Sequence, residues 1–238
     1  MNLSEMIDKR KSVRSFGDDP VSDEILDQLE KFIAGAKPLY SEIKVDIRVV
    51  GKENVRFYFP WKSRQLLAVF SENKQGYLEN VGFILQQVDL YLQSLGIGTC
   101  WLGLGKLRSL EDMPEGMDFV ILMAFGHTKP DFLRTSVAQF KRKSMEEISD
   151  ICDQRLEPAR LAPSSTNSQP WYFVHDGDMI HAYRDKAGER RHKMLGHMNR
   201  IDMGIALSHL YVSSPDSFRF FRVEAAQEGY EYIGTVTL

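Results

Sequence analysis

The chain has 238 residues, of which 43% are hydrophobic, enough for one large domain or two small ones with a sizeable core. A formal net charge of −3 and a pI near 6.1 argue against a nucleic-acid-binding protein, which usually carries a strong basic excess. The first residues contain no basic segment followed by an apolar run, and no stretch has the length of a membrane span, so we expect a cytoplasmic protein without nucleic-acid or membrane partners.

The first predicted elements are two helices on either side of a basic segment. Apolar residues at helical spacing predict a short helix over residues 3–7. Four cations follow within residues 9–16. Ser22 then suits the N-cap of a helix whose apolar residues recur at intervals of three and four until Gly35 and Pro38 end it.

Strands and a long helix follow. Residues 45–50 alternate like a half-buried strand, and residues 66–70 are a continuous apolar run typical of a fully buried one. Apolar residues at helical intervals predict a central helix over residues 75–95. The three glycines of residues 96–103 allow a close backbone approach to another group, and residues 119–125 predict a second buried strand.

A second series of elements starts at Ser144. Ser144 and Glu147 have the spacing of a capping box, which predicts a helix running to about Leu161. The remaining elements are predicted as a hairpin over residues 171–183 that turns at 176–178, a helix over 198–211, and strands near 218–223 and 232–236.

Two short sequence matches indicate an internal repeat. Residues 25–28 resemble residues 151–154, and residues 81–85 resemble residues 203–207. The two separations, 126 and 122 residues, agree closely. The matches predict two related halves, residues 1–143 and 144–238, packed as one globular unit.

A polar loop between two prolines follows the predicted helix of the second half. Pro163 and Pro170 restrict the backbone, while the hydroxyl and amide groups of Ser164, Ser165 and Asn167 can donate and accept hydrogen bonds close together. This composition suits a site for a flat, hydrogen-bonding ligand. It also suits an ordinary helix-to-strand connection, because serine and asparagine favour turns.

The two cysteines form no CxxC pair. Cys100 and Cys152 are far apart and stand among apolar residues, which predicts buried free thiols in a reducing compartment.

Four motifs of the chain are informative when taken together. They are Arg10-Lys-Ser-Val-Arg-Ser-Phe16, Leu95-Gly-Ile-Gly-Thr-Cys-Trp-Leu-Gly103, Ala124-Phe-Gly126 with Lys141-Arg-Lys-Ser-Met-Glu-Glu-Ile148, and Ala162-Pro-Ser-Ser-Thr-Asn-Ser-Gln-Pro-Trp171. This combination resembles the FMN-dependent nitroreductase family. The resemblance implies an α+β fold that binds FMN at an interface between two subunits, with NADH or NADPH as the reductant.

The order of the motifs departs from that family. The proline-flanked loop, which the resemblance would place near Gly35, appears in the second half instead, and the second half lacks an Arg-x-Ser-x-Arg-x-Phe segment. The chain is therefore similar to a subfamily with two fused nitroreductase-like halves. We expect mainly antiparallel sheets with long central helices, arranged as an intramolecular pseudo-dimer with one flavin site, in a protein that is a monomer or a homodimer.

The resemblance implies a cofactor-binding set from both halves. Arginine and serine side chains would bind the FMN phosphate, and the backbone near Cys100 would approach the ring. The full predicted set is Arg10, Lys11, Ser12, Arg14, Cys100, Trp101, Leu102, Gly103, Arg142, Pro163, Ser164, Ser165, Asn167 and Gln169. The basic run could also be a solvated helix end, the tryptophans could be core residues, and Gln169 could hold the loop without touching the cofactor.

No acid, base, nucleophile or metal motif is assigned, because the flavin itself would carry the electrons. The function expected from the resemblance is an FMN-dependent NAD(P)H oxidoreductase that reduces a small-molecule electron acceptor. The alternative is a catalytically silent FMN-binding carrier or sensor. The segment 54–64 is a candidate lining for the acceptor.

Overall fold

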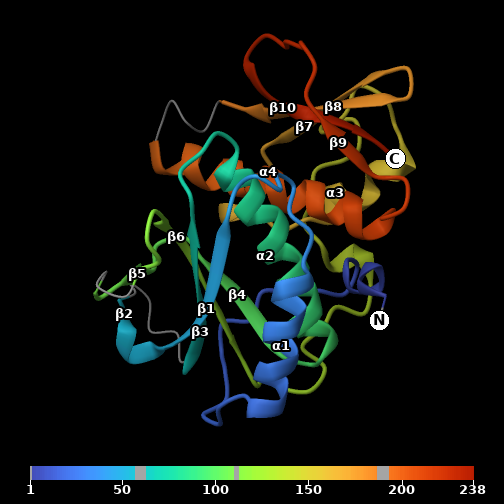
Figure 1. Cartoon of the computed structure of the whole chain (residues 1–238). Helices are drawn as coiled ribbons and strands as arrows, with labels where there is room; N and C mark the ends of the chain where they lie inside the picture. The colour runs from blue at the N-terminus through green and yellow to red at the C-terminus, as the bar shows by residue number, and fades with distance from the viewer. Residues whose placement is uncertain (1, 57–62, 110–112, 187–192) are drawn as a thin grey trace.

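Two antiparallel sheets, one from each part of the chain, lie on either side of two long crossing helices (Figure 1). This computed structural model describes residues 2–56, 63–109, 113–186 and 193–238. Within the described helices, none is both long enough and apolar enough to cross a membrane. The α+β class and the antiparallel sheets predicted from the sequence are confirmed.

The first sheet has the strand order β1-β3-β6-β4. Its strands are β1 (Val45–Gly51), β3 (Gln65–Ser71), β4 (Gly98–Leu102) and β6 (Asp118–Gly126). The apolar runs of β3 and β6 make them central and buried, whereas β1 at the edge is half exposed. Two further short strands, β2 (Val55–Arg56) and β5 (Lys106–Leu107), pair with each other.

The second sheet has the strand order β7-β8-β10-β9. Its strands are β7 (Trp171–Asp176), β8 (Met179–Asp185), β9 (Arg219–Phe221) and β10 (Tyr230–Thr237). The predicted hairpin is confirmed, with Gly177 at a φ of 59° in its turn. Taken in chain order, the strands of both sheets have the same arrangement, in which the fourth strand lies between the second and the third.

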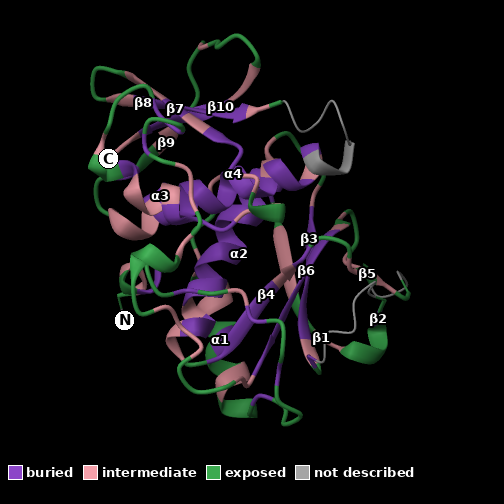
Figure 2. Ribbon diagram, turned by 180° about the vertical axis from the view of Figure 1, so that it is seen from behind, coloured by how far each residue is buried: buried purple, intermediate pink, exposed green. Residues whose placement is uncertain are grey.

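In each sheet a long helix connects the second strand to the third. These helices are α2 (Tyr77–Ser94) and α4 (Lys193–Ser213), and they are mostly buried (Figure 2). The helix α1 (Asp23–Gly35) begins after Ser22, whose hydroxyl accepts a hydrogen bond from the Ile25 amide. The predicted short N-terminal helix is a 3-10 helix, Leu3–Met6. The other 3-10 helices described are Lys52–Asn54, Val137–Gln139, Gln154–Leu156 and Ser165–Asn167.

One glycine from each long helix allows α2 and α4 to cross in close contact. A Cβ atom at Gly82 would lie 2.1 Å from the Ile201 carbonyl oxygen, and one at Gly204 would lie 1.9 Å from the Glu79 carbonyl oxygen. Each glycine is the second residue of one of the matched segments, 81–85 and 203–207. The crossing therefore uses equivalent positions of the two helices.

The helix predicted over residues 144–161 is wrong in its first part. The Ser144 amide donates to the Glu147 carboxylate at 2.8 Å, as in a capping box, but the helix does not continue. Instead the Phe173 amide of β7 donates to the Ile148 carbonyl at 2.8 Å, and the Asp150 amide donates to the Phe173 carbonyl. These backbone groups are paired with the second sheet and are not available to a helix.

Helical structure resumes only near the end of that segment. Asp153 caps the 3-10 turn Gln154–Leu156, which leads into α3 (Glu157–Leu161). Pro158 is in the first turn of α3, where the missing amide is tolerated. Residues 151–154 consequently do not match the helical residues 25–28 in structure, although their sequences are similar.

Candidate functional site

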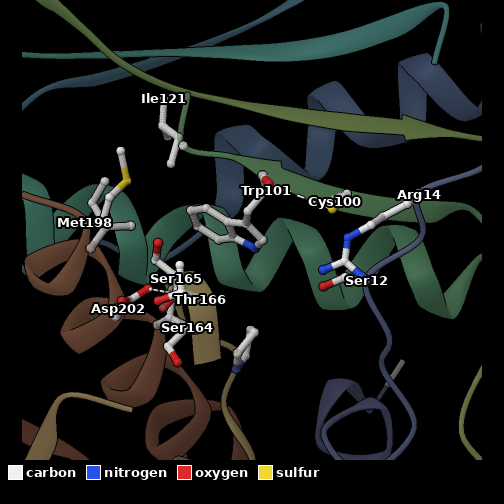
Figure 3. A pocket seen from close by; sticks show the side chains of 14 residues that line it. Ser12, Arg14, Cys100, Trp101, Ile121, Ser164, Ser165, Thr166, Met198 and Asp202 are labelled. Atoms are coloured by element: carbon white, nitrogen blue, oxygen red, sulfur yellow. Dashed lines mark hydrogen bonds between the residues drawn. The ribbon is translucent and has the colours of Figure 1, made fainter. Parts of the chain in front are cut away.

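A pocket of about 160 Å³ lies between the N-terminal segment, β4, the loop after α3, and α4 (Figure 3). Several residues of the predicted set line it: Ser12, Arg14, Cys100, Trp101, Gly103, Pro163, Ser164 and Ser165. Thr166, Met198 and Asp202 also line the pocket, although sequence analysis had not singled them out. The pocket thus receives side chains from both parts of the chain.

The N-terminal segment reaches the pocket because it runs beside β4. Ser12 forms a parallel bridge with Thr99, and the Val13 amide donates to the Thr99 carbonyl at 2.8 Å. This pairing sets Ser12 and Arg14 next to the part of β4 that carries Cys100 and Trp101. The bridge joins residues that are far apart in the sequence, so local patterns could not predict it.

The loop after α3 has an unusual backbone that its contacts hold in place. Thr166, Asn167 and Gln169 have φ values of 53°, 59° and 47°, in the left-handed region that residues other than glycine rarely adopt. The Ser165 amide donates to the Asp202 carboxylate at 3.0 Å, and the Gln169 amide donates to the Ser164 hydroxyl at 2.9 Å. These bonds present Ser164 and Ser165 to the pocket.

Arg10 lies outside the pocket and is only 1% exposed. Its Nε is 3.1 Å from Asp89 Oδ2 in a buried ion pair, and its Nη2 donates to the Ser12 hydroxyl at 3.3 Å. The Gln93 amide group also donates to Asp89, at 2.8 Å. Arg10 therefore supports the pocket through Ser12.

Two more predicted residues are outside the pocket. The Lys11 backbone amide donates to the Gln93 side chain at 2.9 Å, while the residue itself is exposed. Leu102 is buried in an apolar cluster with Leu66 and Leu122. Leu102 thus serves the core of the first sheet.

Arg142, Asn167 and Gln169 form the outer support of the loop. Arg142 donates to the Asn167 side chain at 2.6 Å and to the Leu161 carbonyl at 3.2 Å. Gln169 accepts a hydrogen bond from the Lys143 amide at 2.7 Å and donates to the Asn167 carbonyl at 3.1 Å. In this arrangement Gln169 holds the loop, as one of the two sequence interpretations proposed.

A third arginine joins Arg10 and Arg142. The Arg134 amide donates to the Lys9 carbonyl at 2.8 Å, and its guanidinium group donates to the Arg10 carbonyl. Burial lowers the pKa of Arg142 to about 10, with further lowering by Arg10, Arg134 and Arg160. Burial and Arg10 likewise lower the pKa of Arg134 to about 10. Such mutual repulsion indicates a region with excess positive charge, which favours an anion.

Burial keeps two acidic groups of the pocket, the Cys100 thiol and the Asp202 carboxyl group, in their neutral forms. Burial raises the pKa of the Cys100 thiol to about 11, so the thiolate needed for nucleophilic attack is scarce at neutral pH. Burial likewise raises the pKa of Asp202 to about 8.

Both cysteines are free, but Cys152 is exposed, so the prediction that both are buried is wrong for Cys152. Residues 148–150 pair with β7, and Cys152 lies exposed after them.

Other sequence predictions concern residues beyond the site. Trp171 is buried in the main core, as the core interpretation predicted. Most of the candidate acceptor lining, residues 57–62 of 54–64, is outside the described residues. In the parts of the chain that the structure describes, no three His, Cys, Asp or Glu side chains are grouped to hold a metal ion.

The profile of the family described as "Putative TM nitroreductase" matches residues 2–214. The chain belongs to this family. Its structure is similar to that of a "putative nitroreductase" from Thermotoga maritima MSB8, with a TM-score of 0.65 and 20% identity over 99% of this chain and 92% of that chain. A comparison with curated proteins found no match. The nitroreductase-like fold expected from the sequence is thereby confirmed.

Two further solved structures of nitroreductases match a smaller part of this chain. A nitroreductase family protein from Clostridium difficile 630 has a TM-score of 0.49 and 16% identity, over 63% of this chain and 98% of that chain. A "putative nitroreductase in complex with FMN" from Desulfovibrio desulfuricans has a TM-score of 0.46 and 18% identity, over 62% of this chain and 94% of that chain.

Proposed function

We propose that this nitroreductase-family protein is an FMN-dependent oxidoreductase that uses NADH or NADPH to reduce a small electron acceptor. The observation that carries the proposal is that one pocket is lined by Ser12 and Arg14 of the N-terminal segment, Trp101 of β4, and Ser164 of the proline-flanked loop. Family membership and the FMN named for one similar structure support the choice of cofactor.

The residues of the pocket fit the chemistry of FMN. Arg14 and Ser12 offer charge-assisted and hydroxyl hydrogen bonds to a phosphate, and Trp101 offers an aromatic surface beside a planar ring. The pocket is smaller than the roughly 300–1,000 Å³ usual for ligand sites, so part of the cofactor would lie outside it. When bound, FMN would supply the electron transfer, taking a hydride from the nicotinamide and reducing the acceptor.

The polypeptide would supply binding and positioning. Arg10 holds the Ser12 hydroxyl, while Asp202 and Gln169 hold the loop that carries Ser164. Arg142 and Arg134 would add positive potential near the phosphate end. No step requires the Cys100 thiol, whose raised pKa suits a packing role.

We further infer that residues 1–143 and 144–238 are two related halves that share one flavin site. The equal strand order of the two sheets and the equivalent positions of Gly82 and Gly204 support this division. The basic segment belongs to the first half and the proline-flanked loop to the second, so one complete set of motifs exists per chain.

The visible spectrum and the flavin content of the purified protein test this proposal. One FMN per chain is the expected value, two would contradict the single site, and none after reconstitution would contradict the function. Stopped-flow mixing with NADH or NADPH then separates the enzyme from the carrier or sensor, because only the enzyme loses its yellow flavin absorbance. Sedimentation velocity distinguishes the monomer from the homodimer.

A further inference from the structure

Asp202 is a buried carboxyl group at the wall of the pocket. It lies on α4, is 3% exposed, and lines the pocket beside Ser165 and Thr166 (Figure 3). Its Oδ1 accepts a hydrogen bond from the Ser165 amide at 3.0 Å. Its Oδ2 is buried from solvent and makes no well-aligned hydrogen bond with the described residues. The Ser168 hydroxyl is near enough to lower the Asp202 pKa, but its proton is donated to Asn199 Oδ1 at 3.2 Å.

The first half carries an asparagine at the equivalent position. Asn80 immediately precedes the segment 81–85 and Asp202 immediately precedes the matching segment 203–207. Asn80 Oδ1 accepts hydrogen bonds from the Leu39 and Tyr40 amides at 2.8 and 3.0 Å, in the loop after α1. Its Nδ2 donates to the Ile43 carbonyl. An amide at this position can therefore hold such a loop and satisfy both of its polar atoms.

Loop anchoring alone therefore does not account for an acid at position 202. A buried carboxylate without a cationic partner is costly, and burial holds Asp202 in its neutral form up to about pH 8. The neutral carboxyl group has an O–H that needs an acceptor, and an unsatisfied buried donor is unfavourable. The pocket is the space that adjoins this group.

We propose that Asp202 is a ligand-binding residue whose protonated carboxyl group donates a hydrogen bond to an acceptor atom of the flavin ring. The inference rests on the proposed function, because it takes the occupant of the pocket to be FMN. If Asp202 is the donor, flavin binding depends on the proton of its carboxyl group. Loss of that proton would remove the hydrogen bond to the flavin.

Other titratable groups line the same pocket or stand on the two long helices. Arg14 of the N-terminal segment and Cys100 of β4 line the same pocket, while His197 and Arg200 are on α4 and Glu79 is on α2. Arg200 is paired with Glu79 at 3.3 Å, and the loop 163–169 contributes no titratable side chain. Since each of these groups remains in Asp202→Asn, a comparison with that variant isolates the carboxyl group.

The test measures the dissociation constant of FMN between pH 7 and 9.5 for the full-length wild type and for Asp202→Asn. Wild-type affinity should be constant below the pKa and fall about tenfold per pH unit above it, because the donor proton is lost. Asp202→Asn should bind within about threefold of the wild type at pH 7, with an almost flat pH profile, since its NH₂ group remains a donor. Riboflavin, which lacks the phosphate, should give the same difference between the two proteins.

Cys152→Ser serves as the control and should keep the wild-type pH profile, because Cys152 is exposed and does not line the pocket. Equal pH profiles for the wild type and Asp202→Asn would overturn the role of Asp202 while leaving FMN binding intact. Tighter wild-type binding at high pH would overturn it as well. Failure of both proteins to bind either flavin would instead contradict the proposed function, and this inference with it.

Discussion

Arg14 lines the pocket and is exposed to solvent, so its removal should affect binding more than folding. We expect Arg14→Ala to weaken FMN binding by about 1.5–3 kcal/mol, which is the usual contribution of a hydrogen bond to a charged group. Equilibrium titration monitored by flavin fluorescence would measure the loss. Arg48→Ala, which removes an exposed arginine on β1, should leave the affinity unchanged. Unchanged affinity in Arg14→Ala as well would exclude Arg14 from the site.

Removal of the Arg10 side chain should instead affect folding more than binding. Arg10→Ala would leave Asp89 buried without its cation, and we expect a loss of about 3–5 kcal/mol in the free energy of unfolding. Chemical denaturation would measure it. Because an amide at position 89 would carry no charge, the double variant Arg10→Ala with Asp89→Asn should recover part of this loss. If Arg10→Ala is as stable as the wild type, the ion pair does not stabilise the fold.

The raised pKa of Asp202 predicts the pH dependence of stability. Between about pH 4 and pH 8 the folded state keeps the Asp202 proton that the unfolded state releases. The free energy of unfolding should therefore fall with rising pH in this window, by up to about 1.4 kcal/mol per unit, and Asp202→Asn should lack this contribution. Denaturant titrations of the flavin-free protein at several pH values would check it, and parallel pH profiles for the two proteins would refute it.

Some site residues could be predicted from sequence and others could not. Ser12, Arg14 and Ser164 belong to motifs whose residue types already indicate anion and ring binding. Asp202 is one polar residue on a long helix, and only its burial under the loop distinguishes it from a solvated one. Arg134 has no local signal either, because its position depends on contacts with residues 9 and 10.

The long helices and the apolar strands were predicted because their patterns are strong over their whole length. The helix 75–95 has apolar residues at regular intervals and forms α2 almost within those bounds. The segment 144–161 has a good capping signal, but pairing of residues 148–150 with β7 outweighs it. The five-residue strand β4 is inside a glycine-rich segment, and glycine weakens the strand pattern.

The crossing of α2 and α4 gives a test at the level of elements. Ala at Gly82 or at Gly204 would bring a Cβ atom within about 2 Å of a carbonyl oxygen, so each helix would have to shift. We expect each substitution to lower the free energy of unfolding by about 1–3 kcal/mol or more. Thermal and denaturant unfolding would measure the change.

Gly35→Ala is the matched control, because no atom lies within 4 Å of a Cβ built at the end of α1. It should be neutral or stabilising by up to about 1 kcal/mol. Similar stability for Gly82→Ala, Gly204→Ala and Gly35→Ala would show that the helices are not in close contact.

The two proposed halves, residues 1–143 and 144–238, should depend on each other in folding. In α2, 15 of 18 residues are buried, and this helix packs against α4, which belongs to the second proposed half. Residues 1–143 or 144–238 expressed alone should therefore be insoluble, whereas co-expression of the two pieces should yield a complex that co-purifies. Circular dichroism of each soluble product would verify its folding. A stable, monomeric first half would contradict this dependence.

The repeated strand order within one chain also determines how many sites a single amino-acid substitution alters. In a symmetric pair of identical chains, each substitution appears twice, once in every copy of the interface. Here both sheets are on one polypeptide, so a substitution in one sheet leaves its counterpart as it was. Position 80 can keep its amide while position 202 carries an acid, and either surface can change independently of the other.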